Sequence, residues 1–325
     1  MISILMAAYN CEKYIAEQIE SILAQTEKNI KLYIYDDKST DSTFQIITAY
    51  ANKHPDKIEA SQNKENTGGA KHNFMKMMIS HKDDYIMLSD HDDIWLPEKI
   101  QKSLEKIKEI EQEYGTQTPA LVHTNLKVVD EDLREISPSY EGMTNRDYEK
   151  KALKNMITMN NAAGCTTIYN RALADLITTE PEYMVIHDWW LALMAAAFGK
   201  IGVIHEPTIL YRQHGGNDIG AKKVLSPRYI RYCLTHIDEI SKKIADSYKQ
   251  AGSFLKQFNE TLTEDQREML KAYASIPGLP RIRRMATIVK HKTYLHGLSR
   301  KAVLFMLFLK EKRITSSIPS PFSDP

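Results

Sequence analysis

The strongest constraint on the fold is a regular alternation of short apolar segments with amphipathic helical segments over the first 90 residues. Strands that alternate with helices are typical of a largely parallel sheet covered by helices. We therefore predict an α/β fold. The apolar, β-prone segments lie at residues 2–7, 30–35, near Ile58 and at 85–88, and the segments with helical spacing lie at 12–24, 42–52 and 70–80.

Polar side chains follow three of the predicted strands. The carboxyl ends of parallel strands meet at one edge of a sheet, and ligands bind beyond that edge. We therefore expect these segments to form one polar site. They are Ala8-Tyr9-Asn10, Asp36 to Ser39, and Ser89 to Asp93.

The composition excludes some classes of protein. Lys and Arg (43) nearly balance Asp and Glu (42), so the net charge of +1 gives no field that would attract nucleic acid. The three cysteines, Cys11, Cys165 and Cys233, lack metal-type spacing, which disfavours a disulfide framework and a structural zinc site. The N-terminus resembles neither a signal peptide nor a membrane anchor, and the longest apolar run, residues 302–309, is too short to span a bilayer. These features fit a reducing cytosol.

Asp90 and Asp92 carry the clearest chemical signal. Two carboxylates at positions i and i+2 on a loop can approach a divalent cation or a ribose from one side. Bound Mg²⁺ or Mn²⁺ neutralises the charge that develops on a departing diphosphate. The alternative is an acidic surface turn ahead of Pro97. The hydrophobic strand before the acids and the segment from Ile94 after them favour the cation site.

In order and spacing, three segments together resemble glycosyltransferase family 2. The resemblance covers about residues 1–220 and implies a GT-A-type nucleotide-diphospho-sugar transferase fold, with a mostly parallel central sheet flanked by helices. It also implies an inverting mechanism, a nucleotide-sugar donor and a divalent metal, Mn²⁺ or Mg²⁺. The segments are Ala8-Tyr9-Asn10, Asp36 to Ser42, and Leu88 to Pro97.

The resemblance assigns the donor nucleotide to the carboxyl ends of the strands. Asp37 matches the residue that accepts a hydrogen bond from a pyrimidine N–H, and Ala8 and Tyr9 match residues that hold the base and ribose. Asp92 matches the direct metal ligand, and Asp90 serves the ribose or the metal. Further donor contacts are expected from Asn10, Ser39, Gly69, Lys71 and Asn73.

The segment from Asn66 to Asn73 opens a helix with two glycines, so its backbone N–H groups could face a phosphate. A turn followed by a helix N-cap is the alternative. The segment matches neither the dinucleotide-binding fingerprint nor the P-loop, which argues against a dehydrogenase or a P-loop enzyme.

Asp188 lies at the start of a strongly apolar helical segment, residues 187–198. A carboxylate there can remove a proton from an attacking hydroxyl. By resemblance, Asp188 occupies the position of the family's general base, and Trp189 and Trp190 could form an apolar platform for a sugar ring. The alternative is an aspartate that caps a buried helix.

Two further segments complete the expected site. Arg212 and His214 resemble the family's R-x-H motif, in which the histidine binds the metal or the diphosphate and the arginine meets phosphate charge. Gly164 and Cys165 match a strand that lines the sugar and acceptor pocket, where Cys165 is expected to be a small packing residue. We expect Asp37, Asp92, Asp188 and His214 to gather around one cleft.

The whole pattern looks most like the rhamnosyltransferase-like branch of the family. This implies dTDP-rhamnose as donor and a lipid-linked polysaccharide or another glycan as acceptor. A UDP-hexose or UDP-N-acetylhexosamine donor stays open, because Asp37 does not separate thymidine from uridine. A non-catalytic nucleotide- or glycan-binding subunit is a further alternative. A sugar-nucleotide pyrophosphorylase is disfavoured, since its N-terminal glycine-rich loop is missing.

We expect a catalytic domain at residues 1–226, with a nucleotide-binding half at about 1–115 and an acceptor half at 116–226, followed by a helical region at 227–325. Residues 281–313 contain ten basic residues and a single acid, and apolar residues are interleaved with them. Such a tail predicts peripheral binding at the inner face of the plasma membrane. Packing on protein is the alternative, and a homo-oligomer stays open.

Overall fold

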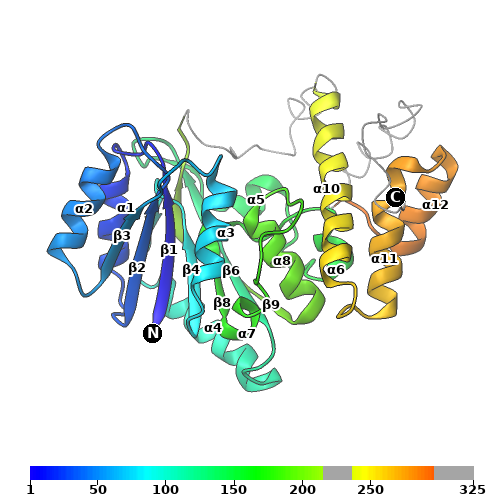
Figure 1. The fold of residues 1–325 in the computed structure, drawn as a ribbon, viewed down its shortest axis with the longest axis horizontal. Coiled ribbons are helices and arrows are strands. Elements are labelled where there is room, and N and C mark those ends of the chain that lie inside the picture. Colours follow the sequence, from blue (N-terminus) through cyan, green and yellow to red (C-terminus); the bar gives the residue numbers. More distant parts are fainter. Residues whose placement is uncertain (215–235, 296–325) are drawn as a thin grey trace. The chain divides into compact units, whose positions relative to one another are not determined.

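The structure is a computed structural model that describes residues 1–214 and 236–295 (Figure 1). The chain divides into two compact units. Among the described residues, the sheet unit consists of 1–143, 162–180 and 198–214, and the helical unit consists of 144–161, 181–197 and 236–295.

The sheet unit is built on a sheet of nine strands in the order β3-β2-β1-β4-β8-β6-β9-β5, with β7 paired to β6. β1 pairs in parallel with β2 and β4, β2 with β3, and β6 with β9. Since β8 is antiparallel to both β4 and β6, these two strands also share one direction. The strands are β1 (Ile2–Ala8), β2 (Ile30–Asp36), β3 (Ile58–Gln62), β4 (Tyr85–Ser89), β5 (Ile94–Trp95), β6 (Ala120–Val129), β7 (Glu135–Ser137), β8 (Thr167–Asn170) and β9 (Lys200–Arg212).

The connections reverse direction beside β1. Two crossovers lead from β1 through α1 to β2 and through α2 to β3, and the next leads back through α3 to β4. Right-handed crossovers then put α1 and α2 on one face of the sheet and α3 on the other, as Figure 1 shows. The carboxyl ends of β1 and β4 lie at this switch point, where open α/β sheets bind ligands. The helices are α1 (Ile15–Leu23), α2 (Thr43–Lys53), α3 (Ala70–Ser80), α4 (Lys99–Tyr114), α5 (Tyr140–Thr144) and α7 (Arg171–Ala174).

Alternation of apolar side chains produces this arrangement. β1 is buried along its whole length, as expected for a strand covered on both faces, whereas β2 alternates buried and half-buried residues. In α1, Ile15, Ile19 and Ile22 recur at helical spacing and are fully buried against the sheet. The predicted α/β fold with a mostly parallel sheet is confirmed.

Two local predictions differ from the structure: the apolar segments at 201–204 and 209–211 predict two separate short strands, and residues 163–168 predict a strand that opens on a glycine. Residues 201–204 and 209–211 belong to one long strand, β9, whose register against β6 shifts near Thr124 and Asn125. Residues 164–166 form a 3₁₀ turn, η1 (Gly164–Thr166), before β8 begins at Thr167. Pairing with a neighbouring strand decided both boundaries, and local sequence patterns do not contain that information.

The helical unit contains the remaining helices. They are α6 (Leu153–Met156), α8 (His187–Phe198), α10 (Ile237–Phe258), α11 (Glu264–Ala274), the 3₁₀ turn η2 (Ile276–Gly278) and α12 (Arg281–His291). α11 begins with a capping box in which Thr263 and Gln266 satisfy each other's backbone N–H groups. The helical spacing of residues 187–198 and 264–274 predicts two helices, and α8 and α11 have these bounds. The sequence also predicts a helix over 229–258, of which α10 covers the part from 237 onward; the residues before 236 lie outside the described part of the chain.

Helix α12 covers the first part of the predicted basic tail. Arg284 and Ile288 are buried, whereas Ile282 is 85% exposed and Val289 is 53% exposed. Residues 296–325, which include the rest of that tail, lie outside the described part of the chain. Within residues 1–214 and 236–295, no helix is long and apolar enough to cross a membrane.

Candidate active site

Asp37 lies just beyond β2 with its carboxylate surrounded by donors. Oδ1 accepts hydrogen bonds from Asn63 Nδ2 (2.8 Å) and from the backbone N–H of Thr67 (2.9 Å), and Oδ2 accepts one from Thr67 Oγ1 (2.8 Å). The N–H of Asp37 donates to the Ala8 carbonyl at 2.8 Å, which ties β2 to β1. A carboxylate offers about four acceptor positions, and these bonds use three of them.

Asn73 supports this arrangement from the first turn of α3. Its Oδ1 accepts a hydrogen bond from Asn63 Nδ2 at 3.0 Å, and its Nδ2 donates to the Tyr35 carbonyl at 2.9 Å. Lys76 Nζ donates to Asn63 Oδ1 at 2.6 Å. Asn73 is buried and acts on Asp37 through Asn63, a residue that the sequence did not single out.

The turn after β1 is closed by side chains of the following segment. Asn10 has a left-handed backbone (φ 45°), its N–H donates to Ser39 Oγ (2.9 Å), and its Oδ1 accepts from the Thr40 N–H (2.9 Å). Asn10 and Ser39 therefore shape the turn. Tyr9 projects from it and is 48% exposed, so its ring is open to solvent at the end of β1.

The glycine pair before α3 has the geometry that its residue type requires. Gly68 and Gly69 have φ of 88° and 137°, conformations that other residues rarely adopt, and an added Cβ at either would meet no atom within 4 Å. Gly69 is the N-cap of α3, and Lys71 lies half-buried in its first turn.

The loop between β4 and β5 brings Asp92 against a residue far along the chain. Asp92 Oδ2 lies 2.9 Å from His214 Nε2, and the His214 ring stacks on Tyr14 with centroids 4.7 Å apart. Adjacent ligand atoms around an octahedral Mg²⁺, each about 2.1 Å from the ion, would be about 3 Å apart. In this structure the two atoms form a direct hydrogen bond, and the same separation is compatible with two neighbouring ligand positions of a divalent cation.

Arg212 holds the loop between β4 and β5 in place through hydrogen bonds. Its side chain is buried, and its guanidinium donates to the Asp92 carbonyl (3.0 Å), the Glu131 carbonyl (2.8 Å) and the Glu17 carboxylate. The guanidinium also lies 4.9 Å from the centre of the Tyr14 ring. These contacts favour a role in positioning the loop over direct contact with a phosphate.

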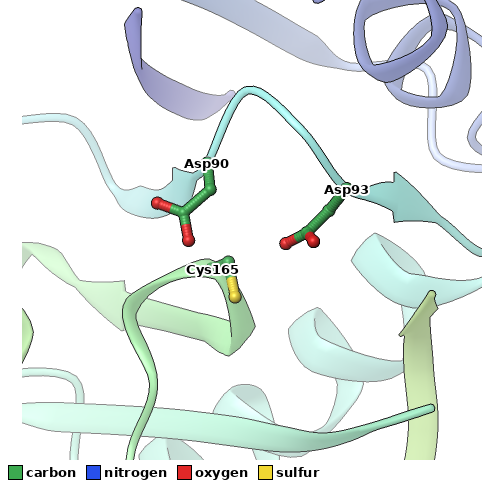
Figure 2. A group of neighbouring side chains, drawn as sticks. All are labelled: Asp90, Asp93 and Cys165. Atoms are coloured by element: carbon green, nitrogen blue, oxygen red, sulfur yellow. The ribbon is translucent and has the colours of Figure 1, made fainter. Parts of the chain in front are cut away.

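Two acids of this loop, the half-buried Asp90 and the buried Asp93, form a cluster with the buried Cys165. Asp90, Asp93 and Cys165 bring one potential ligand atom each within 4.8 Å of one another, as Figure 2 shows. Burial, reinforced by Asp92 and then Asp90, raises the pKa of Asp93 well above its ordinary value. Burial likewise raises the pKa of the Cys165 thiol, so this cysteine is protonated at neutral pH. Gly164 and Cys165 are both buried in η1, and Cys165 lies next to the loop acids Asp90 and Asp93.

Lys99 is a buried cation next to this cluster. Its side chain is inaccessible to solvent, its Nζ has no hydrogen-bond partner among the described residues, and it lies 4.6 Å from the centre of the Trp95 ring. Burial lowers the pKa of Lys99 to about 7, and the nearby Cys165 and Asp93 oppose that shift. A lysine as the first residue of a helix, where the dipole favours acids, is the sequence signal that could have identified it.

Asp188 belongs to the helical unit and lies in the first turn of α8. It is 7% exposed, and its Oδ1 accepts a hydrogen bond from Asn160 Nδ2 at 3.0 Å. Burial lowers the pKa of the neighbouring His187 to about 3, so this ring is neutral at physiological pH.

The two tryptophans after Asp188 are built into the helical unit. Trp189 is 9% exposed and donates its indole N–H to the Met156 carbonyl at 2.5 Å. Trp190 is fully buried, with ring centroids 5.2 Å from Phe254 and 6.2 Å from Phe258. These contacts favour a packing role for Trp190 over contact with a sugar.

Comparison with known proteins identifies the family. The family model of glycosyl transferase family 2 matches residues 3–177, more than half of the chain. The chain belongs to glycosyltransferase family 2. It is 28% identical over 264 residues to the dTDP-rhamnosyl transferase RfbG of Shigella flexneri, covering 74% of this chain and 85% of that protein. It is 41% identical over 104 residues to the putative glycosyltransferase EpsE of Bacillus subtilis, covering 32% of this chain and 37% of EpsE.

Solved structures show the same fold at low sequence identity. Residues 1–349 of S. aureus TarS, in complex with UDP-GlcNAc, match with a TM-score of 0.54 and 17% identity, covering 90% of this chain and 92% of that one. The mannosyltransferase PcManGT of Pyrobaculum calidifontis, in complex with GDP-Man and Mn²⁺, matches with a TM-score of 0.51 and 14% identity, covering 94% of this chain and 78% of that one. The fold of this glycosyltransferase is therefore of the GT-A type.

Proposed function

We propose that this glycosyltransferase moves a sugar from a nucleotide diphosphate to an acceptor hydroxyl with inversion, and that dTDP-rhamnose is the donor. The proposal rests above all on the pair of Asp92 and His214, whose ligand atoms lie 2.9 Å apart at the strand edge where the family holds its donor. The rhamnose donor is supported by the similarity to RfbG over three quarters of the chain.

The donor would lie along the carboxyl ends of β1, β2 and β4. Asp37 has an acceptor position left for a pyrimidine N–H, and the exposed ring of Tyr9 can stack on the base. Asp92 and His214, with Asp90 nearby, would hold a divalent cation, Mg²⁺ or Mn²⁺. Such a cation neutralises charge on the departing diphosphate when it is bound.

Asp188 would act as the general base. Its carboxylate takes the proton of the acceptor hydroxyl while that oxygen attacks the anomeric carbon, and the bond from that carbon to the diphosphate oxygen breaks in the same displacement. This single displacement inverts the anomeric centre and needs no covalent intermediate. The acceptor we propose is a glycan or a lipid-linked sugar.

Two substitutions test these roles. Asp188→Asn should lower the rate of transfer by about 10²- to 10⁴-fold and leave nucleotide binding nearly intact, because it removes a base and no donor contact. Asp92→Ala should abolish the metal-dependent binding of the donor, measured by calorimetry. The opposite pattern would show that the two roles are exchanged, and full activity of both variants would contradict the proposal.

A panel of nucleotide sugars tests the donor. A ligand that binds the folded protein raises its melting temperature, so dTDP-rhamnose with Mn²⁺ or Mg²⁺ should stabilise the protein more than UDP-glucose, UDP-galactose or UDP-N-acetylglucosamine. Stronger stabilisation by one of the UDP sugars would favour the alternative of a UDP-hexose or UDP-N-acetylhexosamine transferase.

We also propose that the basic C-terminal region binds the inner face of the plasma membrane. In the described part of that region, α12 exposes Ile282 and Val289 among Arg281, Arg283 and Lys290. Exposed apolar side chains flanked by cations favour an anionic lipid surface. Co-sedimentation with anionic vesicles that does not change when residues 281–325 are deleted would exclude this.

A further inference from the structure

Asn160 makes a side-chain contact with the residue proposed as the base. Its Nδ2 donates to Asp188 Oδ1 at 3.0 Å. Asn160 is half-buried and Asp188 is 7% exposed, so the hydrogen bond is largely screened from water. A hydrogen bond to a charged group is stronger than one between neutral groups.

The backbone around Asn160 is itself fixed. The guanidinium of Arg146 donates to the Asn160 carbonyl, and Asn161 Nδ2 donates to the Asp147 carbonyl at 3.0 Å. These two bonds join the segment that contains residues 146 and 147 to the segment that contains residues 160 and 161. Only the bond from Arg146 is made to Asn160 itself, and it fixes the backbone from which the Asn160 side chain extends.

The start of α8 is anchored to the same segment. The indole of Trp189 donates to the Met156 carbonyl, four residues before Asn160. Residues on both sides of the contact between Asn160 and Asp188 are therefore held by contacts that do not involve the two side chains themselves. The hydrogen bond is part of a prearranged geometry.

We propose that Asn160 is the positioning residue for Asp188, fixing the rotation of the carboxylate and favouring its ionised form. The amide group of asparagine does not ionise, so its N–H donates at any working pH. A donor directed at a carboxylate stabilises the charged form of that carboxylate. A base held by a third group is the arrangement on which efficient proton transfer depends. The inference rests on the proposed role of Asp188.

His187, the residue before Asp188 in α8, does not contribute a titration to the pH profile. Burial lowers the pKa of His187 to about 3, so this neighbour stays neutral over the range of the pH profile. The acid limb of kcat/KM should therefore report the ionisation of Asp188.

The test compares Asn160→Ala, Asn160→Asp and Asn161→Ala in the full-length protein. Asn160→Ala should lower kcat by about 10- to 100-fold, leave the nucleotide Kd unchanged and move the acid limb to higher pH. Asn160→Asp should move the acid limb further, because a second carboxylate disfavours ionisation of the first, and should regain activity at alkaline pH.

Asn161→Ala is the matched control. It removes a neighbouring amide that bonds to the Asp147 carbonyl, so it should lower the melting temperature and leave the acid limb where it is in the parent protein. The inference is overturned if Asn160→Ala keeps the parent kcat and pH profile, or if Asn161→Ala shifts the limb equally. If Asp188→Asn is inactive while Asn160→Ala is normal, only this inference fails. If Asp188→Asn stays active, the proposed base is wrong.

Discussion

Two acidic positions of the sheet unit, Asp37 and the Asp90 to Asp93 loop, lie at the same edge of the sheet but in opposite electrostatic situations. Asp37 accepts three hydrogen bonds from Asn63 and Thr67. The acids of the loop crowd together, and burial with two neighbouring carboxylates raises the pKa of Asp93.

The difference indicates what each position is built to receive. Asp37 is an acceptor with its charge already compensated, which suits a neutral ligand that donates one N–H. The loop brings the carboxyl groups of Asp90, Asp92 and Asp93 close enough to raise the pKa of Asp93, and such a group of oxygen ligands suits a cation. A site for the base and a site for the metal would thus differ in whether hydrogen-bond donors or further carboxyl groups lie next to the acid. Four predictions can break or sharpen this contrast.

The largest effect is expected for the loop. Asp92→Asn keeps the size of the side chain but removes a charge and a cation ligand, so kcat/KM for transfer should fall by about 10³-fold or more, in line with the several kcal/mol that a metal contributes. Steady-state kinetics with a titration of Mn²⁺ and of Mg²⁺ would measure it. Activity that is normal and indifferent to chelator would remove the basis for a cation at this loop.

A smaller effect is expected at Asp37. Asp37→Asn should raise KM for the donor by about 10- to 100-fold with kcat within a few fold, because the contact is made equally in the ground state and the transition state. Thr67→Val, which removes one of the three internal bonds, serves as a milder companion and should raise KM less. A fall in kcat as large as that of Asp92→Asn would erase the contrast between the two positions.

The third prediction concerns Lys99. In the unfolded chain this lysine stays protonated up to about pH 10.5, whereas in the folded protein it is protonated only below about pH 7. Between these values unfolding takes up a proton, so Lys99 makes stability rise with pH in this window.

Lys99→Met should remove that contribution and flatten the increase in Tm between pH 7 and pH 9 by a few degrees, about 2–4 °C for each kcal/mol. Calorimetry at both pH values measures it. Lys106→Met is the control: the Lys106 side chain is 39% exposed and pairs with Glu109, so this variant should keep the slope of the parent protein. An unchanged slope in Lys99→Met would mean that this lysine is not a buried, weakly basic group.

The smallest effect is expected at Tyr14. Its ring supports His214, and its hydroxyl donates to Glu131 Oε1 at 2.9 Å. Tyr14→Phe keeps the ring and loses one partly exposed hydrogen bond, so the affinity for the cation should fall by only about 2- to 5-fold. Tyr14→Ala should weaken it more. Equal losses in both variants would assign the effect to the hydroxyl and not to the ring.

Much of this arrangement could be predicted from the sequence. The alternation of apolar segments indicated the sheet and its helices, and the polar segments after β1, β2 and β4 do meet at one edge, as the register of Ala8 with Asp36 and of Met6 with Ser89 shows. The family resemblance pointed to Asp92 and His214, which the structure brings to 2.9 Å. The roles of these residues in catalysis stay predictions.

The supporting residues could not be predicted in the same way. Asn63, Thr67, Glu17 and Asn160 carry no local signature, because an asparagine, a threonine or an exposed glutamate is common on any loop or helix. Arg212 looked like a phosphate ligand by motif, and only its buried contacts with Glu17 and the Asp92 carbonyl reveal its work in holding the loop.

The residues alone determined the fold class, the family and the side chains that could do chemistry, since periodicity and residue type act locally along the chain. The tertiary structure decided which of those side chains are satisfied, crowded or held. Hydrogen bonding and the cost of burying charge depend on neighbours as far apart in sequence as Asp92 and His214 or Asn160 and Asp188. Such residues become neighbours only in the folded chain, so local sequence patterns cannot reveal their contacts.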